Sequence, residues 1–276
     1  ALSAADLATY RHLSKTWVGL LARLLSVVPI ACWDIACVAL VAWLLLVLVR
    51  RLWRRLPISG VMSWACCVAS VTLALFVWGW ALNHYAAPLW VELDLEVENT
   101  SVDELAEVTQ AYLCEAAALA PEVPRDANGT LARQDFYELA CVAGASYEPL
   151  AETYEAFRGS TAPVKALTLL GEPLLYSGHT GIFWAPTGES GVPLNCPAAD
   201  MPFVMCHEAA HRLGIADEGE ANFAACLACE ASNDVRLRYA GAYNAFVYCF
   251  NALCRADAAR AGELVEALEG GELWDG

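Results

Sequence analysis

Charged residues are scarce in this sequence. They make up 17% of its 276 residues, whereas soluble domains carry about a quarter. Hydrophobic residues reach 58% of the chain. This composition excludes an ordinary soluble domain and predicts a part that is embedded in a membrane.

Positive charge is scarce in the second part of the chain. Residues 87–276 hold nine Lys and Arg against thirty Asp and Glu, a net charge of −21, whereas residues 1–86 carry +5. A surface this acidic repels nucleic acid and anionic lipid headgroups. We therefore expect no nucleic-acid partner and expect residues 87–276 to lie in water.

The 12 cysteines do not define a disulfide framework, because sequence alone cannot assign their pairing. The pair Cys226 and Cys229 has the CxxC spacing but lacks the second CxxC of a zinc ribbon. We interpret this pair as packing residues.

Two apolar stretches are long enough to cross a bilayer, near residues 30–50 and 58–82; the second carries no charge, and the only charge between Ile30 and Val49 is Asp34, at the outer edge of the first. Four arginines crowd the turn between them, and no Lys or Arg follows until Arg125. The positive-inside rule puts this turn in the cytoplasm. We therefore expect a plasma-membrane protein with two spans and both termini extracytoplasmic, and no cleaved signal peptide.

The chain before the first span has helical apolar spacing over residues 5–25. This pattern fits either an amphipathic helix at the membrane surface or a helix packed on the later domain. The predicted domains are an interfacial helix at 1–29, a transmembrane hairpin at 30–86 and an extracytoplasmic domain at 87–276.

A zinc-binding motif lies in that last domain. His207 and His211 stand four residues apart, so a helix presents both imidazoles on one face. Glu208 lies beside them, where a carboxylate accepts a proton from the attacking water. Gly214 ends the helix. This HExxH pattern predicts a zinc peptidase.

A catalytic zinc needs a third protein ligand, and three carboxylates follow the motif: Asp217, Glu218 and Glu220. We rank Glu218 first, because Asn222 lies four residues further on the same helical face and can orient a ligating histidine. Asp217 fits the alternative pattern HExxHxxGxxD. The charges in this region exclude a span here, and thus a protease that cuts inside the bilayer.

Shorter patterns complete the domain. A strand is expected at 181–186, where Gly181, Ile182, Phe183 and Trp184 would hold an extended peptide along a free edge, with a turn at 188–191. Helices are expected near 101–120, 131–143, 150–157, 234–249 and 257–268, followed by a tail at 270–276 without a periodic pattern. The predicted class is mainly α with a small sheet.

These motifs resemble an uncharacterised bacterial family of membrane-anchored proteins with two helices and a zinc-peptidase domain. The shared residues are 181–183, 186–189, 206–211, 218–222 and a tyrosine-rich helix at 239–243. More remotely, Glu218-x-x-Ala221-Asn222 is similar to the Glu-x-x-Ala-Asp of gluzincin membrane metallopeptidases. The resemblance implies an α+β zincin-like fold.

The predicted activity is zinc-dependent hydrolysis of a peptide or protein substrate by a protein bound to the lipid bilayer. His207, His211 and Glu218 would hold Zn²⁺, and Glu208 would act as the general base. An oxyanion donor is expected from Tyr239 or Tyr243, of which Tyr239 is ranked first. Two alternatives stay open: a zinc-containing membrane sensor with little turnover, and a structural membrane protein with an accidental motif.

Overall fold

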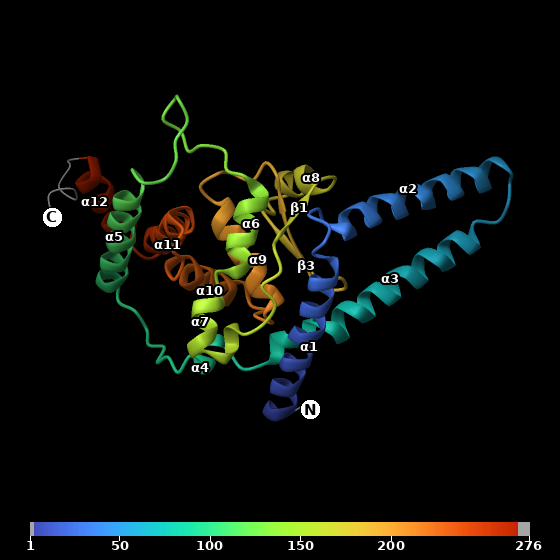
Figure 1. The fold of residues 1–276 in the computed structure, drawn as a ribbon, viewed down its shortest axis with the longest axis horizontal. Coiled ribbons are helices and arrows are strands. Elements are labelled where there is room, and N and C mark those ends of the chain that lie inside the picture. Colours follow the sequence, from blue (N-terminus) through green and yellow to red (C-terminus); the bar gives the residue numbers. More distant parts are fainter. Residues whose placement is uncertain (1–2, 270–276) are drawn as a thin grey trace.

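The computed structural model describes residues 3–269 and is mainly helical (Figure 1). The predicted tail at 270–276 lies outside the described residues. In the N-terminal part the helical elements are α1 Ala4–Leu25, α2 Cys32–Trp53, α3 Ser59–Gly79, η1 Ala81–Tyr85 and α4 Leu89–Glu92. In the rest of the chain they are α5 Val102–Leu119, α6 Phe136–Ala145, α7 Glu148–Thr153, η2 Glu155–Phe157, α8 Gly171–Tyr176, α9 Met201–Arg212, α10 Glu218–Glu230, α11 Val235–Ala256 and α12 Ala258–Glu269.

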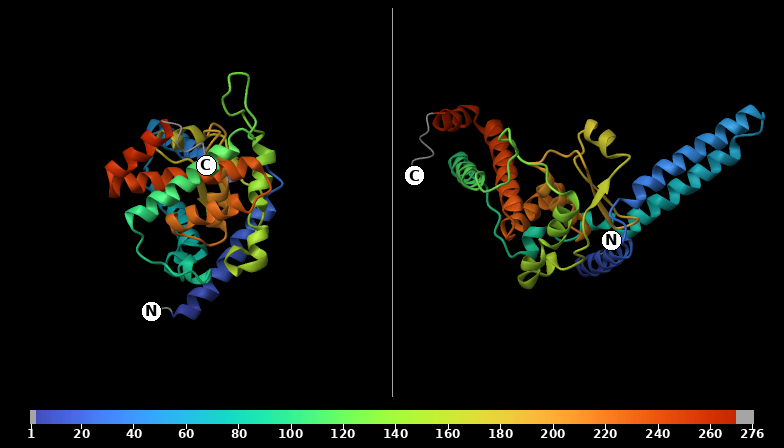
Figure 2. Two further views of the ribbon diagram at one scale, coloured as in Figure 1. Left: turned by 90° about the vertical axis from the view of Figure 1, so that its left-hand side faces the viewer. Right: turned by 45° about the horizontal axis from the view of Figure 1, so that its top comes forward.

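Helices α2 and α3 form a hairpin that projects away from the rest of the molecule (Figures 1 and 2). Both are long and apolar enough to cross a membrane, which agrees with the two predicted spans. Only 11% and 6% of their apolar windows are buried, whereas a core helix of a soluble protein would be mostly covered. The four arginines lie at the tip of the hairpin, farthest from the domain.

Helix α1 lies across the base of the hairpin (Figures 1 and 2). One face packs on the domain and is small or polar, with Arg11, Ser14 and Val18 buried. The opposite face is apolar and exposed, and it carries Leu13, Trp17, Leu20 and Leu24. The helix therefore packs on the domain and also leaves an apolar face uncovered.

A small sheet lies beside the base of the hairpin, with strand order β1-β3-β2. Strand β3 (Glu189–Pro193) pairs in parallel with β1 (Lys165–Leu167) and antiparallel with β2 (Ile182–Trp184). The predicted strand is thus confirmed and is an edge strand. The turn expected at 188–191 is wrong: β3 already begins at Glu189, and Gly188 makes the turn with φ +69°.

Buried charges fasten the hairpin to this sheet. Glu189 pairs with Lys165 at 2.8 Å and accepts hydrogen bonds from the first two backbone N–H groups of α2. Asp34, which the sequence placed at the edge of the membrane, is instead fully buried in the domain. It accepts hydrogen bonds from the backbone of Thr168, Leu169 and Leu170. The start of α2 is therefore fixed to the domain rather than hinged.

The core of the domain surrounds α9, which packs against β3 and helices α6, α10 and α11. Helix α11 packs along α5 and α12 on the far side from the hairpin. The predicted capping box of Ser101 and Glu104 opens α5 as expected. Helix α6 begins at Phe136 rather than near 131, because Asp135 caps its first turn.

Candidate metal centre

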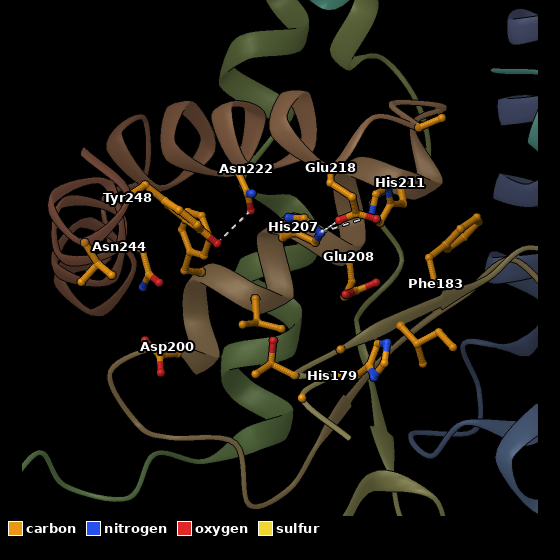
Figure 3. A pocket seen from close by; sticks show the side chains of 18 of the residues that line it. His179, Phe183, Asp200, His207, Glu208, His211, Glu218, Asn222, Asn244 and Tyr248 are labelled. Carbon is orange, nitrogen blue, oxygen red and sulfur yellow. Dashed lines mark hydrogen bonds and ion pairs between the residues drawn. The ribbon is translucent and has the colours of Figure 1, made fainter. Parts of the chain in front are cut away.

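Helix α9 presents the two motif histidines on one face, as predicted (Figure 3). Their Nε2 atoms lie 3.1 Å apart. Gly214 follows the helix with φ +83°, a conformation that favours glycine, and the chain turns back. The carbonyl of Ile215 then lies 2.8 Å from His211 Nδ1. The turn after the helix thus orients the ring of His211.

Glu218, at the start of α10, completes the cluster. Its carboxylate oxygens lie 3.1 Å from His207 Nε2 and 3.6 Å from His211 Nε2. The alternatives are engaged elsewhere: Asp217 caps α10 through the backbone N–H of Glu220, and the Glu220 carboxylate accepts from the backbone N–H of Leu89. The structure therefore brings together the three residues that the sequence ranked first.

The chemistry of these donors fits a metal ion. His211 Nδ1 faces a carbonyl oxygen, so it carries the proton and leaves Nε2 as a lone pair in the neutral ring. That lone pair converges with His207 Nε2 and the Glu218 carboxylate, a set of ligand atoms that suits a bound cation. Zinc at about 2.0–2.1 Å from tetrahedral ligands would separate them by about 3.3 Å. The two Nε2 atoms lie 3.1 Å apart, and Glu218 offers Oε2 at 3.1 Å from His207 and Oε1 at 3.6 Å from His211, distances close to this value.

The carboxylate and the imidazoles of the cluster stabilise each other's charged forms. Hydrogen bonds with His207 and His211 hold the pKa of the Glu218 carboxyl well below its usual range. Burial alone disfavours the protonated form of His211, but the Glu218 and Glu208 carboxylates outweigh it and raise its pKa. The side chain of Glu218 is 78% exposed, so one side of the cluster stays open to solvent.

Glu208 points into the same site from the next position on α9 (Figure 3). It is buried, and this burial raises the pKa of its carboxyl to about 7, against the lowering effect of His211 and His207. Within the described part of the chain, its Oε2 has no hydrogen-bond partner. The carboxyl lies directly against Gly181, where an added Cβ would stand 2.5 Å from Oε1. A buried, unpaired carboxyl beside the cluster suits a proton acceptor.

The cluster lies in a depression of about 850 Å³ that we call the cleft. Elements β2, α9, α10, α11 and the end of α3 surround it. Gly181, Ile182 and Phe183 line it, as predicted for substrate-binding residues. The prediction that Trp184 binds substrate is wrong. Its side chain does not line the cleft and instead stacks on Trp33 at the start of α2, with ring centroids 5.0 Å apart. Successive strand residues point to opposite faces, so Phe183 and Trp184 diverge.

The prediction that Tyr239 donates to the oxyanion is also wrong, because this residue does not line the cleft. It stacks on Tyr243 and packs beside Ala116 and Leu119 of α5, away from the cleft that Tyr243 and Tyr248 line. Tyr248 was not predicted, and its hydroxyl donates to Asn222 at 3.3 Å (Figure 3). Asn222 lines the cleft, but the predicted hydrogen bond from a ligating histidine to its amide is absent among the described residues.

The sequence also missed Trp80, which follows the second span. Its indole N–H donates to the carbonyl of His211 at 2.8 Å, and its ring lies 5.8 Å from that imidazole. Phe76 and His84 line the same wall of the cleft. Sequence reasoning has no signal for this wall, because a run of aromatic residues after a span is also typical of a membrane–water interface. The predicted boundary between residues 86 and 87 therefore divides residues that line one site.

Comparisons with known proteins assign no activity. No curated protein and no solved structure matches the chain. A family model described as "Protein of unknown function (DUF3810)" matches residues 10–272, nearly the whole chain. That description names no chemistry, so the resemblance to zinc peptidases stays a prediction. The chain belongs to the DUF3810 family.

Proposed function

We propose that this protein is a membrane-anchored, zinc-dependent peptidase. One observation carries the proposal: the ligand atoms of His207, His211 and Glu218 all lie within 4.8 Å of one another in a cleft that also contains the Glu208 carboxyl. A catalytic zinc keeps three protein ligands and an open position, and the exposed side of Glu218 leaves such an opening. The fold around it would be zincin-like, with β2 as the edge strand above the metal helix.

The chemistry divides between metal and protein. A bound zinc ion lowers the pKa of water towards about 7 and polarises a peptide carbonyl. Glu208 would take the proton of the attacking water and return it to the leaving amine, and the burial of its carboxyl beside the cluster suits this role. The free edge of β2 would hold the peptide extended by backbone hydrogen bonds. Tyr243, which the sequence also offered, and Tyr248 both line the cleft, and these two are the candidates for an oxyanion donor.

The orientation in the membrane is part of the proposal. The arginines at the hairpin tip favour a cytoplasmic tip, which puts the cleft, Ala1 and Gly276 on the extracytoplasmic side of the plasma membrane.

The test of this function is Glu208→Gln in the full chain, because Trp80 and Phe76 belong to the cleft and a truncation at residue 88 would remove them. Gln keeps the size of the side chain but loses the oxygen that accepts a proton. Zinc content should stay near that of the wild type, while cleavage of a mixed peptide library falls by about 10²–10⁴-fold.

Equal cleavage by Glu208→Gln and wild type at equal zinc content would exclude Glu208 as the base. A fully loaded wild-type protein that cleaves nothing in the library would favour the zinc-containing sensor instead. A matched control is Glu155→Gln, since the side chain of Glu155 is exposed and, within residues 3–269, its ion-pair partner is Arg158 on the surface. That variant should cleave like the wild type.

A further inference from the structure

The cleft is partly built by the outer end of a membrane span. Phe76 lies three residues before the end of α3 at Gly79, a rise of about 4.5 Å along the helix. Trp80 and His84 follow directly, and both line the cleft. The ring of Trp80 lies 5.8 Å from His211 and 5.3 Å from Phe183. The candidate metal centre is therefore only one side chain away from the last turn of α3.

Strand β2 contacts the outer ends of both spans. Phe183 packs on Trp80, just after α3, and Trp184 stacks on Trp33, the second residue of α2. The two helices that enter the bilayer thus set the height of β2 above its surface. Since β2 is the edge strand that faces the cleft, a peptide held along it lies at the same level.

Helix α1 marks the plane of the bilayer surface independently. It crosses the base of the hairpin, and its exposed face carries Leu13, Trp17, Leu20 and Leu24 (Figure 2). An apolar groove of about 570 Å³ lies between this face and α3, lined in part by Trp17 and Trp78. Tryptophans gather at the level of lipid headgroups, so acyl chains are the occupant that this groove fits. Val18, on the buried face of α1, packs with Trp80 at the wall of the cleft.

The domain is not free to lift away from this surface. The buried pair Lys165–Glu189 and the buried Asp34 fasten the first turn of α2, and the hydroxyl of Ser14 donates to the carbonyl of Gly79 at 2.7 Å. The first two contacts hold α2 to the sheet beside the cleft, and the third joins α1 to the end of α3. A cleft on a flexible linker could reach substrates far from the membrane, but this one is fixed beside it.

We propose that the cleft accepts polypeptides anchored in the same membrane and binds a segment close to where it leaves the bilayer. The headgroup layer is about 5–7 Å thick on each side. An extended chain advances about 3.3 Å per residue, so two or three residues suffice to reach the cleft. This inference rests on the proposed peptidase function for the cut itself, but the location of the cleft and the capture of a segment are testable without turnover.

The first experiment places the cleft relative to lipid. The full chain, with photoreactive benzoylphenylalanine in place of either His84 or Tyr248, is reconstituted in liposomes of phosphatidylethanolamine and phosphatidylglycerol. Both residues are exposed and line the cleft, but His84 lies next to α3 and Tyr248 lies on α11. Irradiation should give lipid adducts at position 84 and few at position 248. Equal adducts at the two positions, or none at 84, would overturn the proposal.

The second experiment tests the substrate class. A randomised peptide segment is joined to a transmembrane helix either directly or through a helical spacer of about twenty residues, which lifts it by about 30 Å. In the Glu208→Gln background, benzoylphenylalanine at position 248 should capture the direct fusion about tenfold more than the lifted one. Both probes have the same surface concentration, so the difference reports how far each segment stands from the bilayer. Equal capture of both probes, or capture of neither, would overturn the proposal.

The wild-type chain separates the two hypotheses. If it cuts neither probe although the direct fusion is captured preferentially, the peptidase function fails and the membrane-surface site stands. If it cuts the lifted segment as fast as the direct one, the peptidase function stands and this inference fails. A second pair of probes, anchored by two acyl chains instead of a helix, shows whether either kind of anchor suffices.

Discussion

Gly181→Ala is a sharp test of the geometry around the base. A Cβ at this position would stand 2.5 Å from Glu208 Oε1, whereas ordinary contact begins at 3.4 Å. The carboxylate, or the start of β2, must therefore move by about 0.9 Å. A misplacement of about 1 Å at a reacting group costs about 10²-fold in rate. The same crowding should destabilise the fold by about 1–3 kcal/mol.

The assay compares zinc content and peptide cleavage of the full chain for wild type, Gly181→Ala and Gly262→Ala. Gly262 is the matched control, because an added Cβ there meets nothing within 4 Å. Gly181→Ala should retain zinc, since the atoms nearest to the added Cβ belong to Glu208 rather than to the three ligands. Cleavage that equals that of the wild type at equal zinc content would refute the placement of Glu208 as the base against this strand.

Three further predictions concern the ligand set, the anchoring of the hairpin and the topology. Glu218→Ala should weaken zinc binding by at least about 10–100-fold while Asp217→Ala leaves it near the wild type; the reverse result in a metal titration would support the HExxHxxGxxD pattern. Lys165→Met breaks a buried ion pair and should cost about 3–5 kcal/mol by thermal unfolding in detergent, a prediction contradicted if the protein unfolds like the wild type. A tag after Gly276 should be accessible from outside the cell and one at Arg51 should not, and swapped labelling would put the cleft in the cytoplasm.

The candidate ligands could be predicted from the sequence because they are local. His207 and His211 share one helical face, and a turn of five residues separates α9 from Glu218. Helical periodicity and the left-handed Gly214 therefore determine most of the geometry. The two spans were equally predictable, since their length and lack of charge depend on no tertiary contact.

The wall of the cleft depends on contacts between distant residues, which periodicity does not encode. Trp80 and His211 are separated by 131 positions in the sequence, and nothing in either segment indicates that they meet. The sequence predicts Asp34 at the edge of a span. In the structure it is buried, and its carboxylate accepts hydrogen bonds from the backbone N–H groups of residues 168–170.

The tyrosines of α11 illustrate the same limit. Sequence showed that this helix carries several, but not which part of its length faces the metal centre. Tyr248 lies nine residues after Tyr239, which is about 13 Å along the helix axis. Packing of α11 against α5 and α9 decides which tyrosines line the cleft, namely Tyr243 and Tyr248 but not Tyr239, and this choice is a tertiary property.

The central claim is that His207, His211 and Glu218 hold a zinc ion. The most direct measurement is metal analysis of the purified full chain after equilibration with Zn²⁺, beside His207→Ala and His179→Ala. His179 lines the same cleft but bonds to Ser177 rather than to the cluster, so it controls for the loss of any imidazole. The account predicts about one zinc ion per chain for wild type and His179→Ala, and almost none for His207→Ala. Equal zinc content in all three proteins, or none in the wild type, would contradict it.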